Sequence, residues 1–214
     1  MIEINFKLDN GIPQYGCTAC SKCESVFGKS LCKVKNRGCC WYFPKFTLFD
    51  IHKMVQDNKG IEVLKDIINL PNVEIHKYYI HAKGFFDKAA YENYIKDEND
   101  EYEDVKDKTI FFRACPFIID GVGCTLGEKY RTHVCNFFIC DEIVKKVENN
   151  SEFKKYVKEK DSYARWIEWE NNSLQHFFME KRLDLTNNLW DIVNILKEMP
   201  LSEYEYGNLN SIYF

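Results

Sequence analysis

Apolar side chains recur at helical spacing in the first third of the chain and predict two short helices there. The first spans residues 48–58, with Thr47 as its N-cap and Gly60 at its end. The second follows directly and stops before Pro71, because the residue that precedes a proline disfavours the helical conformation. His52 falls on the apolar face of the first helix, so we interpret it as a core histidine.

The part of the chain after Cys140 is the most strongly helical. Apolar and aromatic residues mark one face of a long helix: Tyr163, Trp166, Ile167, Leu174, Phe177 and Phe178. A further face with the same spacing is formed by Leu189, Ile192, Val193 and Leu196. An aromatic stripe of this kind is far more often core than a cofactor site, so we expect residues 142–200 to form a helical C-terminal part of the core.

Only short segments have the pattern of strands. Residues 73–81 are rich in β-forming side chains, and residues 109–112 are an apolar run that we expect to form a buried strand leading into Cys115. Residues 86–96 have a helical pattern. Glycines interrupt residues 1–46, for which we expect loops and turns rather than a long helix.

These elements predict a single domain, residues 1–214, that is mainly α with a few short strands. The 214 residues are 45% hydrophobic, which is enough to bury a core. No apolar run approaches the ~20 residues that span a bilayer, so we expect no membrane segment. The first seven residues lack the basic-then-apolar pattern of a secretion signal, which indicates a cytoplasmic protein. A net charge of −4 gives no reason to expect nucleic acid as a partner, and the excess of Lys over Arg is typical of an AT-rich bacterial genome.

The cysteines are the most informative residues of the chain. Six of the ten lie within residues 17–40 and four within residues 115–140, and there are none in the 74 residues between these ranges or in the 74 after them. In a reducing compartment, clustered cysteines serve metals or reactivity rather than disulfides. We therefore expect two cysteine blocks, residues 17–46 and 109–141, to meet in an irregular cysteine-rich core and form a shared metal centre packed against helices.

The spacing within the blocks suits coordination by thiolates. Cys17, Cys20 and Cys23 form a C-x2-C-x2-C run like the opening of the bacterial ferredoxin motif, and Cys115-Pro116 supplies a remote cysteine followed by proline. This pattern favours an iron–sulfur cluster. Zinc is the close alternative, because four thiolates also satisfy a structural zinc site. The expected ligands are Cys17, Cys20, Cys23, Cys39, Cys40, Cys115, Cys124, Cys135 and Cys140.

With these motifs the sequence resembles the YkgJ-type cysteine-cluster proteins, a family described as a zinc- or iron-chelating domain. The first block contributes C-x2-C-x2-C and the Cys39-Cys40 pair. The second block matches the family pattern at Cys115, Pro116, Cys124, Arg131, Cys135, Phe138 and Cys140. The resemblance implies a metal-binding protein whose ligands come from both blocks.

The resemblance covers residues 17–140 and departs from the family at several positions. Thr132 and Asn136 stand where the family has Pro and Arg, and Glu24 stands where its double cysteine would fall. Which of the first four cysteines are ligands is therefore open, and Cys32 is the best candidate for a buried, inert thiol.

Arg131 and His133 are further candidates beside the second block. Arg131 would donate hydrogen bonds to cluster sulfur or to a carboxylate near it and so bind the cofactor indirectly, or it would form an ordinary ion pair. His133 stands two residues before Cys135 and could act as a ligand. Lys29 and Arg37 belong to a basic loop among the first cysteines, where the missing zinc-finger spacing argues against nucleic-acid binding.

Two other functions are compatible with the sequence. The Cys-Pro-Phe-Ile block that begins at Cys115 resembles a block of the flagellin lysine N-methylases, which implies a protein-modifying enzyme that binds S-adenosylmethionine. The acidic run of residues 97–104 is a solvated loop or a docking site for a basic protein partner, in which case the chain is a zinc-stabilised interaction module. No Ser–His–Asp order, phosphate-binding glycine loop or His-Glu-x-x-His motif points to a particular reaction.

Overall fold

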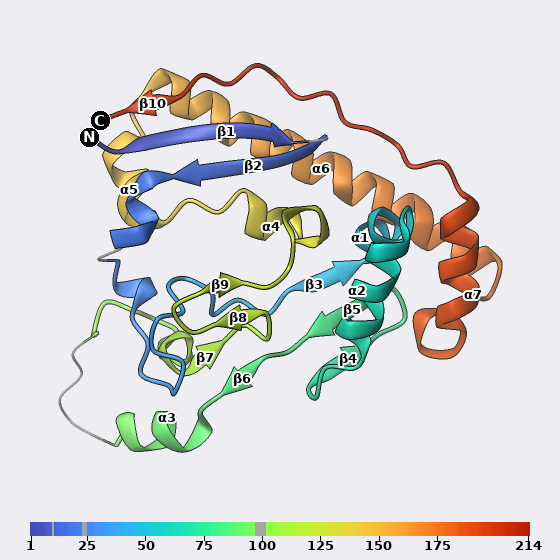
Figure 1. Ribbon diagram of the computed structural model, residues 1–214, viewed down its shortest axis with the longest axis horizontal. Helices are drawn as coiled ribbons and strands as arrows, with labels where there is room; N and C mark the ends of the chain where they lie inside the picture. Colours follow the sequence, from blue (N-terminus) through green and yellow to red (C-terminus); the bar gives the residue numbers. More distant parts are fainter. Residues whose placement is uncertain (10, 23–24, 97–101) are drawn as a thin grey trace. The chain divides into compact units, whose positions relative to one another are not determined.

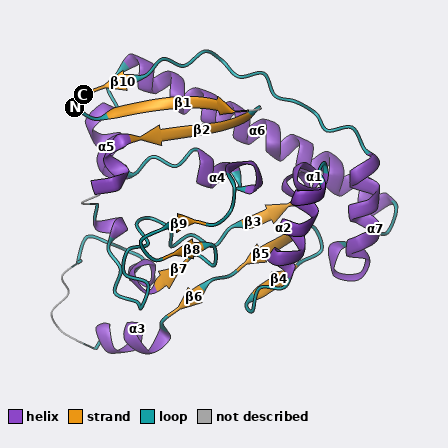
Figure 2. Cartoon of the chain, viewed as in Figure 1, coloured by secondary structure: helices purple, strands orange, loops and turns teal. Residues whose placement is uncertain are grey.

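The computed structural model describes residues 1–9, 11–22, 25–96 and 102–214. The described chain divides into two compact units. Unit 1 comprises Met1–Ala19, Lys45–Ala82 and Leu126–Phe214, and unit 2 comprises Cys20–Pro44 and Lys83–Thr125. Helices predominate and the strands are short (Figure 2), which confirms the predicted fold class, mainly α with a few short strands. A single domain over the whole chain stays a prediction.

Unit 1 combines most of the helices with two small antiparallel sheets (Figure 1). Its helices are α1 (Leu48–Val55), α2 (Asn58–Ile68), α4 (His133–Asn136), α5 (Asp141–Val147), α6 (Ser151–Glu180), α7 (Leu185–Glu198) and the 3-10 helix η4 (Glu128–Tyr130). Its strands are β1 (Glu3–Asp9), β2 (Ile12–Cys17), β3 (Lys45–Thr47), β4 (Val73–Ile75), β5 (Tyr79–Ala82) and β10 (Ile212–Tyr213). The sheets have the strand orders β10-β1-β2 and β3-β5-β4.

The hairpin of β1 and β2 is a structure that the loop prediction for residues 1–46 missed. Apolar and polar residues alternate along β1, and Gly11 in the turn has a φ of 77°, a conformation that glycine adopts without strain. Ile4 on β1 is fully buried in a cluster with Tyr156 of α6 and Ile212 of β10. The alternation therefore reflects one face of the sheet packed against a helix.

Thr47 caps α1 as predicted. Its side chain accepts a hydrogen bond from the backbone N–H of Asp50, and the Asp50 carboxylate accepts one from the backbone N–H of Thr47 at 3.1 Å. This reciprocal capping box satisfies two donors that the first helical turn leaves without partners. The helix ends at Val55, three residues earlier than predicted.

The prediction that Gly60 ends the first helix is wrong. Gly60 lies in the first turn of α2, where Asp57 is the N-cap and accepts the N–H of Gly60 at 2.7 Å. A Cβ atom at Gly60 would come within 1.8 Å of the backbone carbonyl oxygen of Met54. Glycine is required here because two helices approach closely, and not because a helix stops.

The single strand predicted over residues 73–81 is a hairpin of two strands. The backbone N–H of His76 donates to the carbonyl of Tyr79 at 2.9 Å, which reverses the chain between β4 and β5. β-forming residues lie on both sides of this turn, so the sequence has the pattern of one continuous strand. The turn contains neither Gly nor Pro, the residues that usually indicate a chain reversal.

The C-terminal helices confirm the predicted faces. In α6, the residues Tyr163, Ile167, Leu174 and Phe178 are buried. His52 is also confirmed as a core histidine, since it is 3% exposed and its Nε2 lies 3.2 Å from the carbonyl oxygen of Met199. No described helix combines the length and the apolar character needed to cross a membrane.

Unit 2 has little regular structure. Its helices are α3 (Lys88–Tyr94) and the 3-10 helices η2 (Val26–Gly28) and η3 (Lys108–Phe112), and its strands are β6 (Phe85–Phe86), β7 (Arg113–Ala114), β8 (Ile118–Ile119) and β9 (Gly123–Cys124). A further 3-10 helix, η1 (Thr18–Lys22), follows β2. The predicted helix over residues 86–96 is present as α3.

The prediction of a strand over residues 109–112 is wrong, because this segment belongs to the 3-10 helix η3. Asp107 caps it by accepting the N–H of Thr109 at 3.1 Å. The predicted burial is confirmed, since Ile110, Phe111 and Phe112 are at most 3% exposed. A short apolar run cannot distinguish a strand from a tight helical turn when both are buried on all sides. Residues 97–101 of the acidic run lie outside the described residues.

Candidate functional site

Each unit contains cysteines of both sequence blocks. Unit 1 contains Cys17, Cys135 and Cys140, and unit 2 contains Cys20, Cys32, Cys39, Cys40, Cys115 and Cys124. Cys23, a predicted ligand, and its neighbour Glu24 lie outside the described residues.

In unit 2 the two blocks meet at Cys40 and Cys115. The backbone N–H of Cys115 donates a hydrogen bond to the carbonyl oxygen of Cys40 at 2.8 Å. The N–H of Leu31 donates to the carbonyl of Phe111 at 2.8 Å, and the Asp120 carboxylate accepts two backbone N–H groups of the first block. These bonds hold the end of the first block beside the start of the second.

Cys115 and Cys124 lie at the open end of one short hairpin. Strands β8 and β9 pair Ile118 with Cys124, and the N–H of Thr125 donates to the carbonyl of Phe117 at 2.7 Å. The N–H of Ile118 donates to the Cys115 carbonyl at 3.2 Å, so the chain turns directly after Cys115. The hairpin therefore places Cys124 opposite Ile118, three residues after Cys115.

The guanidinium of Arg37 is buried within the first block. This residue is 2% exposed, and its Nη2 donates to the carbonyl oxygen of Ile110 at 2.8 Å. Burial lowers the pKa of Arg37, and the negative charges of Cys32, Cys39 and Cys40 as thiolates oppose this shift. A buried positive charge thus lies close to the thiols of this block.

Cys32 is a buried thiol, as the sequence indicated. It is 1% exposed, and its Sγ lies 3.3 Å from Ser30 Oγ and 3.8 Å from the carbonyl oxygen of Val34. These local contacts give Cys32 a packing role inside the first block.

In unit 1, Cys17 and Cys140 border the same hydrophobic cluster. Cys17 ends β2, and Cys140 is the N-cap residue of α5. Both are partly buried against the cluster that contains Ile4 and Tyr156. One cysteine from each block therefore lies next to this part of the core.

Arg131 forms an ordinary ion pair with Glu128, which was one of the two roles predicted for it. Its Nε donates to the carbonyl of Leu126 at 2.9 Å, and its Nη2 lies 3.6 Å from Glu128 Oε1. Cys135 is exposed on α4, and the hydroxyl of Thr132 donates to its Sγ at 3.6 Å. A contact between Arg131 and a metal centre stays a prediction.

The spacing of the cysteines bears on which metal they fit. Among the described residues, the potential metal ligands that gather within 4.8 Å of one another are Glu74, His76 and His81, and no cysteine belongs to this group. A tetrahedral zinc ion with bonds of about 2.3 Å draws its four sulfurs to within about 4 Å of one another. A four-iron cluster spreads its thiolates farther apart, because each binds a different iron. In the described part of the chain, no three cysteine sulfurs are gathered closely enough for a closed zinc site.

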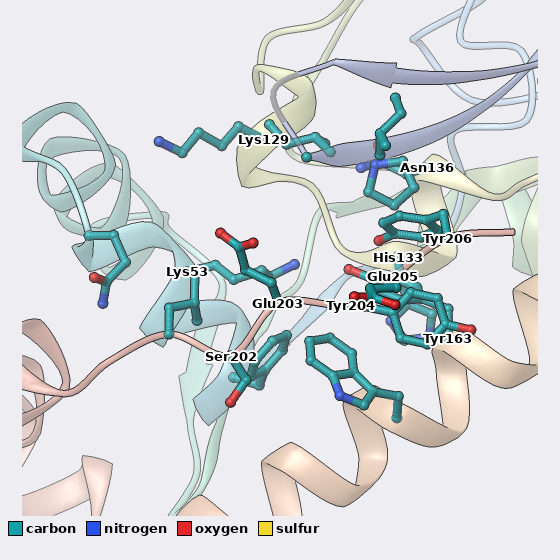
Figure 3. A pocket seen from close by; sticks show the side chains of 18 residues that line it. Lys53, Lys129, His133, Asn136, Tyr163, Ser202, Glu203, Tyr204, Glu205 and Tyr206 are labelled. Atoms are coloured by element: carbon teal, nitrogen blue, oxygen red, sulfur yellow. The ribbon is translucent and has the colours of Figure 1, made fainter.

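Unit 1 also contains a cavity of about 770 Å³, which Figure 3 shows from close by. Its aromatic lining consists of Phe49, Tyr163, Trp166, Tyr204 and Tyr206. The rings of Tyr163 and Trp166 are stacked with centroids 5.6 Å apart, and Tyr204 lies against both. The aromatic stripe of α6, predicted as core alone, therefore also forms a cavity wall.

Asn136 and His133 of α4 present polar atoms to this cavity. The Asn136 side-chain nitrogen donates to the carbonyl of Glu128 at 3.0 Å, which leaves its Oδ1 as an acceptor. This Oδ1 and the Nδ1 of His133 are buried and make no hydrogen bond within the described ranges. A buried polar atom without a partner is uncommon, and in a cavity wall it indicates where a ligand or water would bind.

Burial and two neighbouring charges act on His133 in the cavity wall. Burial lowers the pKa of His133, and Lys53 adds to this effect while Asp50 opposes it. Burial also disfavours the charge of Lys53, but Asp50, whose Oδ1 is 3.2 Å from Lys53 Nζ, and Tyr163 together outweigh it, so the pKa of Lys53 is raised. The cavity lining therefore includes a buried imidazole and a lysine that forms an ion pair with Asp50.

Sequence reasoning did not anticipate this cavity. Its only local signal is the pair of tyrosines at alternate positions, Tyr204 and Tyr206, in the segment after α7. Burial raises the pKa of Tyr206, whose side chain hydrogen-bonds to that of Tyr163. The partner that buries these rings lies far away in the sequence, so no local pattern could have identified the cavity.

No family model, curated protein or solved structure matches this chain.

Proposed function

We propose that this chain is a metal-binding protein that holds an iron–sulfur cluster or zinc through cysteine thiolates. The observation that carries the proposal is the hydrogen bond from Cys115 to Cys40, which joins the two cysteine blocks inside unit 2. Cys39 precedes Cys40, and the β8–β9 hairpin adds Cys124 to the same unit. Four thiols from the two blocks are thus candidates for one centre.

The buried charge of Arg37 supports the proposal. A centre bound by several thiolates carries net negative charge, which a cation in a low-dielectric surrounding offsets. Arg37 is 2% exposed and lies near Cys39 and Cys40. When bound, an iron–sulfur cluster would supply electron transfer, and zinc would stabilise the fold. The C-x2-C-x2-C run of Cys17, Cys20 and Cys23 favours the cluster.

The identity of the metal is tested on protein purified under anaerobic conditions. We expect a brown preparation with visible absorption, stoichiometric iron and acid-labile sulfide. A colourless preparation with one equivalent of zinc would show that the thiolates bind zinc and not an iron–sulfur cluster. Protein that binds neither iron nor zinc would contradict the proposal.

The ligands are tested by serine substitution with a buried cysteine as the control. Cys40→Ser and Cys115→Ser should each lose most of the bound metal, because a serine hydroxyl is a poor ligand for iron and zinc. Cys32→Ala should keep it, since Cys32 contacts Ser30 and Val34 instead. Equal metal content in all three variants would contradict the assignment of Cys40 and Cys115.

The cavity of unit 1 favours a second candidate function, the binding of a small planar ligand. Its aromatic wall offers ring faces for stacking, and Asn136 Oδ1 offers an acceptor to a ligand N–H group. The volume of about 770 Å³ is within the usual range for ligand sites. This function would also serve the enzymatic alternative that the resemblance to lysine N-methylases implies.

Trp166 in the cavity wall is a natural reporter for this second candidate. Quenching of tryptophan fluorescence is measured during titration with adenine and with S-adenosylmethionine, and Trp166→Phe identifies the signal from the cavity. Asn136→Leu should weaken binding by about 10-fold or more, as expected for the loss of one buried hydrogen bond. No response to S-adenosylmethionine would contradict the methylase alternative, and no response to any probe would contradict ligand binding of this class.

A further inference from the structure

Glu74, His76 and His81 gather on the β4–β5 hairpin of unit 1. Glu74 on β4 lies directly opposite His81 on β5 in the antiparallel register. His76 follows β4, and its ring stacks on that of Tyr79 with centroids 4.3 Å apart and an angle of 15° between the planes. The backbone of the hairpin therefore fixes two of the three side chains relative to each other, and the ring stack restrains the third.

These side chains offer two imidazoles and a carboxylate at distances that a metal ion can bridge. Their potential ligand atoms all lie within 4.8 Å of one another. Glu74 Oε2 is 3.5 Å from His76 Nε2 and 3.9 Å from His81 Nδ1. A tetrahedral zinc ion with bonds of about 2.0–2.2 Å holds its ligand atoms about 3.5 Å apart. Small rotations of surface side chains would close the group around an ion.

A second observation comes from the hydrogen bonding of His76. Its Nε2 is buried and makes no hydrogen bond in the described part of the chain, although the Glu74 carboxylate is near. A metal ion at the centre of the group would give this nitrogen a partner. The side chains of His76, Glu74 and His81 are 41%, 45% and 18% exposed, so ions from solvent can reach the group and water can complete the coordination.

We propose that Glu74, His76 and His81 form a binding site for a divalent transition-metal ion. Two imidazoles and one carboxylate are typical ligands of Zn²⁺ and Fe²⁺, whereas Ca²⁺ and Mg²⁺ prefer oxygen ligands alone. The site contains no cysteine and lies in a unit different from that of Cys40 and Cys115. It is therefore independent of the proposed thiolate centre.

Cobalt(II) is a suitable probe because its absorption distinguishes the two kinds of ligand. Thiolates give intense charge-transfer bands in the near ultraviolet, whereas imidazole and carboxylate give only weak bands in the visible. Tag-free full-length protein is titrated with Co²⁺, and we expect a component without thiolate bands that Zn²⁺ displaces. Glu74→Gln and His76→Gln should weaken this component by about 100-fold or more, since even the loss of groups that only support ligands costs ~10–100-fold.

The exposed His176 on α6 provides the matched control, and His176→Gln should bind like the unchanged protein. Glu74→Gln is nearly isosteric at a half-exposed position, and circular dichroism verifies that it is folded. Cys40→Ser should lose thiolate bands and keep the component without them. Undiminished binding in Glu74→Gln and His76→Gln would overturn the proposal, as would loss of the component in Cys40→Ser alone.

Discussion

Arg37 donates a hydrogen bond from Nη2 to the carbonyl oxygen of Ile110 at 2.8 Å, across 73 positions of sequence. The same guanidinium donates to the carbonyls of Lys29 and Gly38. One buried side chain thus ties the first cysteine block to the segment that leads into Cys115.

Replacing Arg37 by Met should destabilise the protein severely. Methionine keeps much of the volume, but it leaves the carbonyls of Lys29 and Gly38 without their donor, while that of Ile110 still accepts the N–H of Arg113. Each buried group without a partner costs about 1–3 kcal/mol. We expect the free energy of unfolding, measured by urea denaturation, to fall by at least about 2 kcal/mol. Arg165→Met on the exposed face of α6 is the control and should change it by less than about 0.5 kcal/mol. Similar values for the two variants would show that Arg37 does not hold the two segments together.

Removal of the metal should lower the stability of the native protein. In the proposed thiolate centre, ligands from both cysteine blocks would couple metal binding to folding, because the unfolded chain cannot gather them. With free metal at 100 times its dissociation constant, binding contributes about 2.7 kcal/mol. A chelator should therefore shift the thermal midpoint downward in the unchanged protein and in Cys32→Ala. If the thermal midpoint stays constant when bound metal is removed, metal binding does not stabilise the fold.

Gly60→Ala should be among the most damaging single-methyl additions in unit 1. The new Cβ would lie 1.8 Å from the Met54 carbonyl oxygen, so α1 and α2 would have to move apart. Overpacking of this kind costs typically about 1–3 kcal/mol. Gly127→Ala is the matched control, since its Cβ would meet only Tyr130 at 3.7 Å. If both variants unfold at the same urea concentration, the close approach at Gly60 is not a constraint.

His52 should make the protein less stable in mild acid. Burial lowers the pKa of His52 in the folded state, and its contact with the Met199 carbonyl only partly opposes this shift. In the unfolded chain histidine titrates near pH ~6.5. The neutral His52 therefore makes its full contribution to stability above that pH. This contribution is lost as the pH falls toward the lower folded-state pKa, because the unfolded state takes up the proton first.

His52→Gln removes this titration. The unfolding free energy of the unchanged protein should fall more steeply between pH 7 and pH 5 than that of the variant, by at most about 1.4 kcal/mol per pH unit. The difference between the two proteins at pH 8 measures the packing cost of the substitution. Parallel curves over the whole range would mean that His52 does not contribute to acid sensitivity.

Local patterns predicted the helices well because their causes are local. The cap at Thr47 and the apolar faces of α1 and α6 are readable from neighbouring residues. The strands were harder to predict. Residues 73–81 form a hairpin whose turn contains neither Gly nor Pro, and residues 109–112 form a 3-10 helix whose burial comes from distant contacts.

The error at residues 73–81 also concealed the histidine–glutamate group. In one continuous strand, Glu74 and His81 would point to opposite faces, because side chains alternate. Because the chain reverses after His76, Glu74 and His81 are instead paired across two neighbouring strands, where their side chains share one face. The cysteine blocks, in contrast, were visible as a compositional signal, although only the fold assigns Cys40 and Cys115 to one unit and Cys17 and Cys140 to the other.

The chain passes between the two units after Ala19, Pro44, Ala82 and Thr125. Neither unit is a continuous stretch of sequence, so no single cut releases one of them whole. Both ends of the chain belong to unit 1, so truncation from either end removes part of unit 1 first. A loss of metal binding on truncation would therefore not reveal which residues bind the metal. Mapping of this protein therefore depends on substitutions within the intact polypeptide.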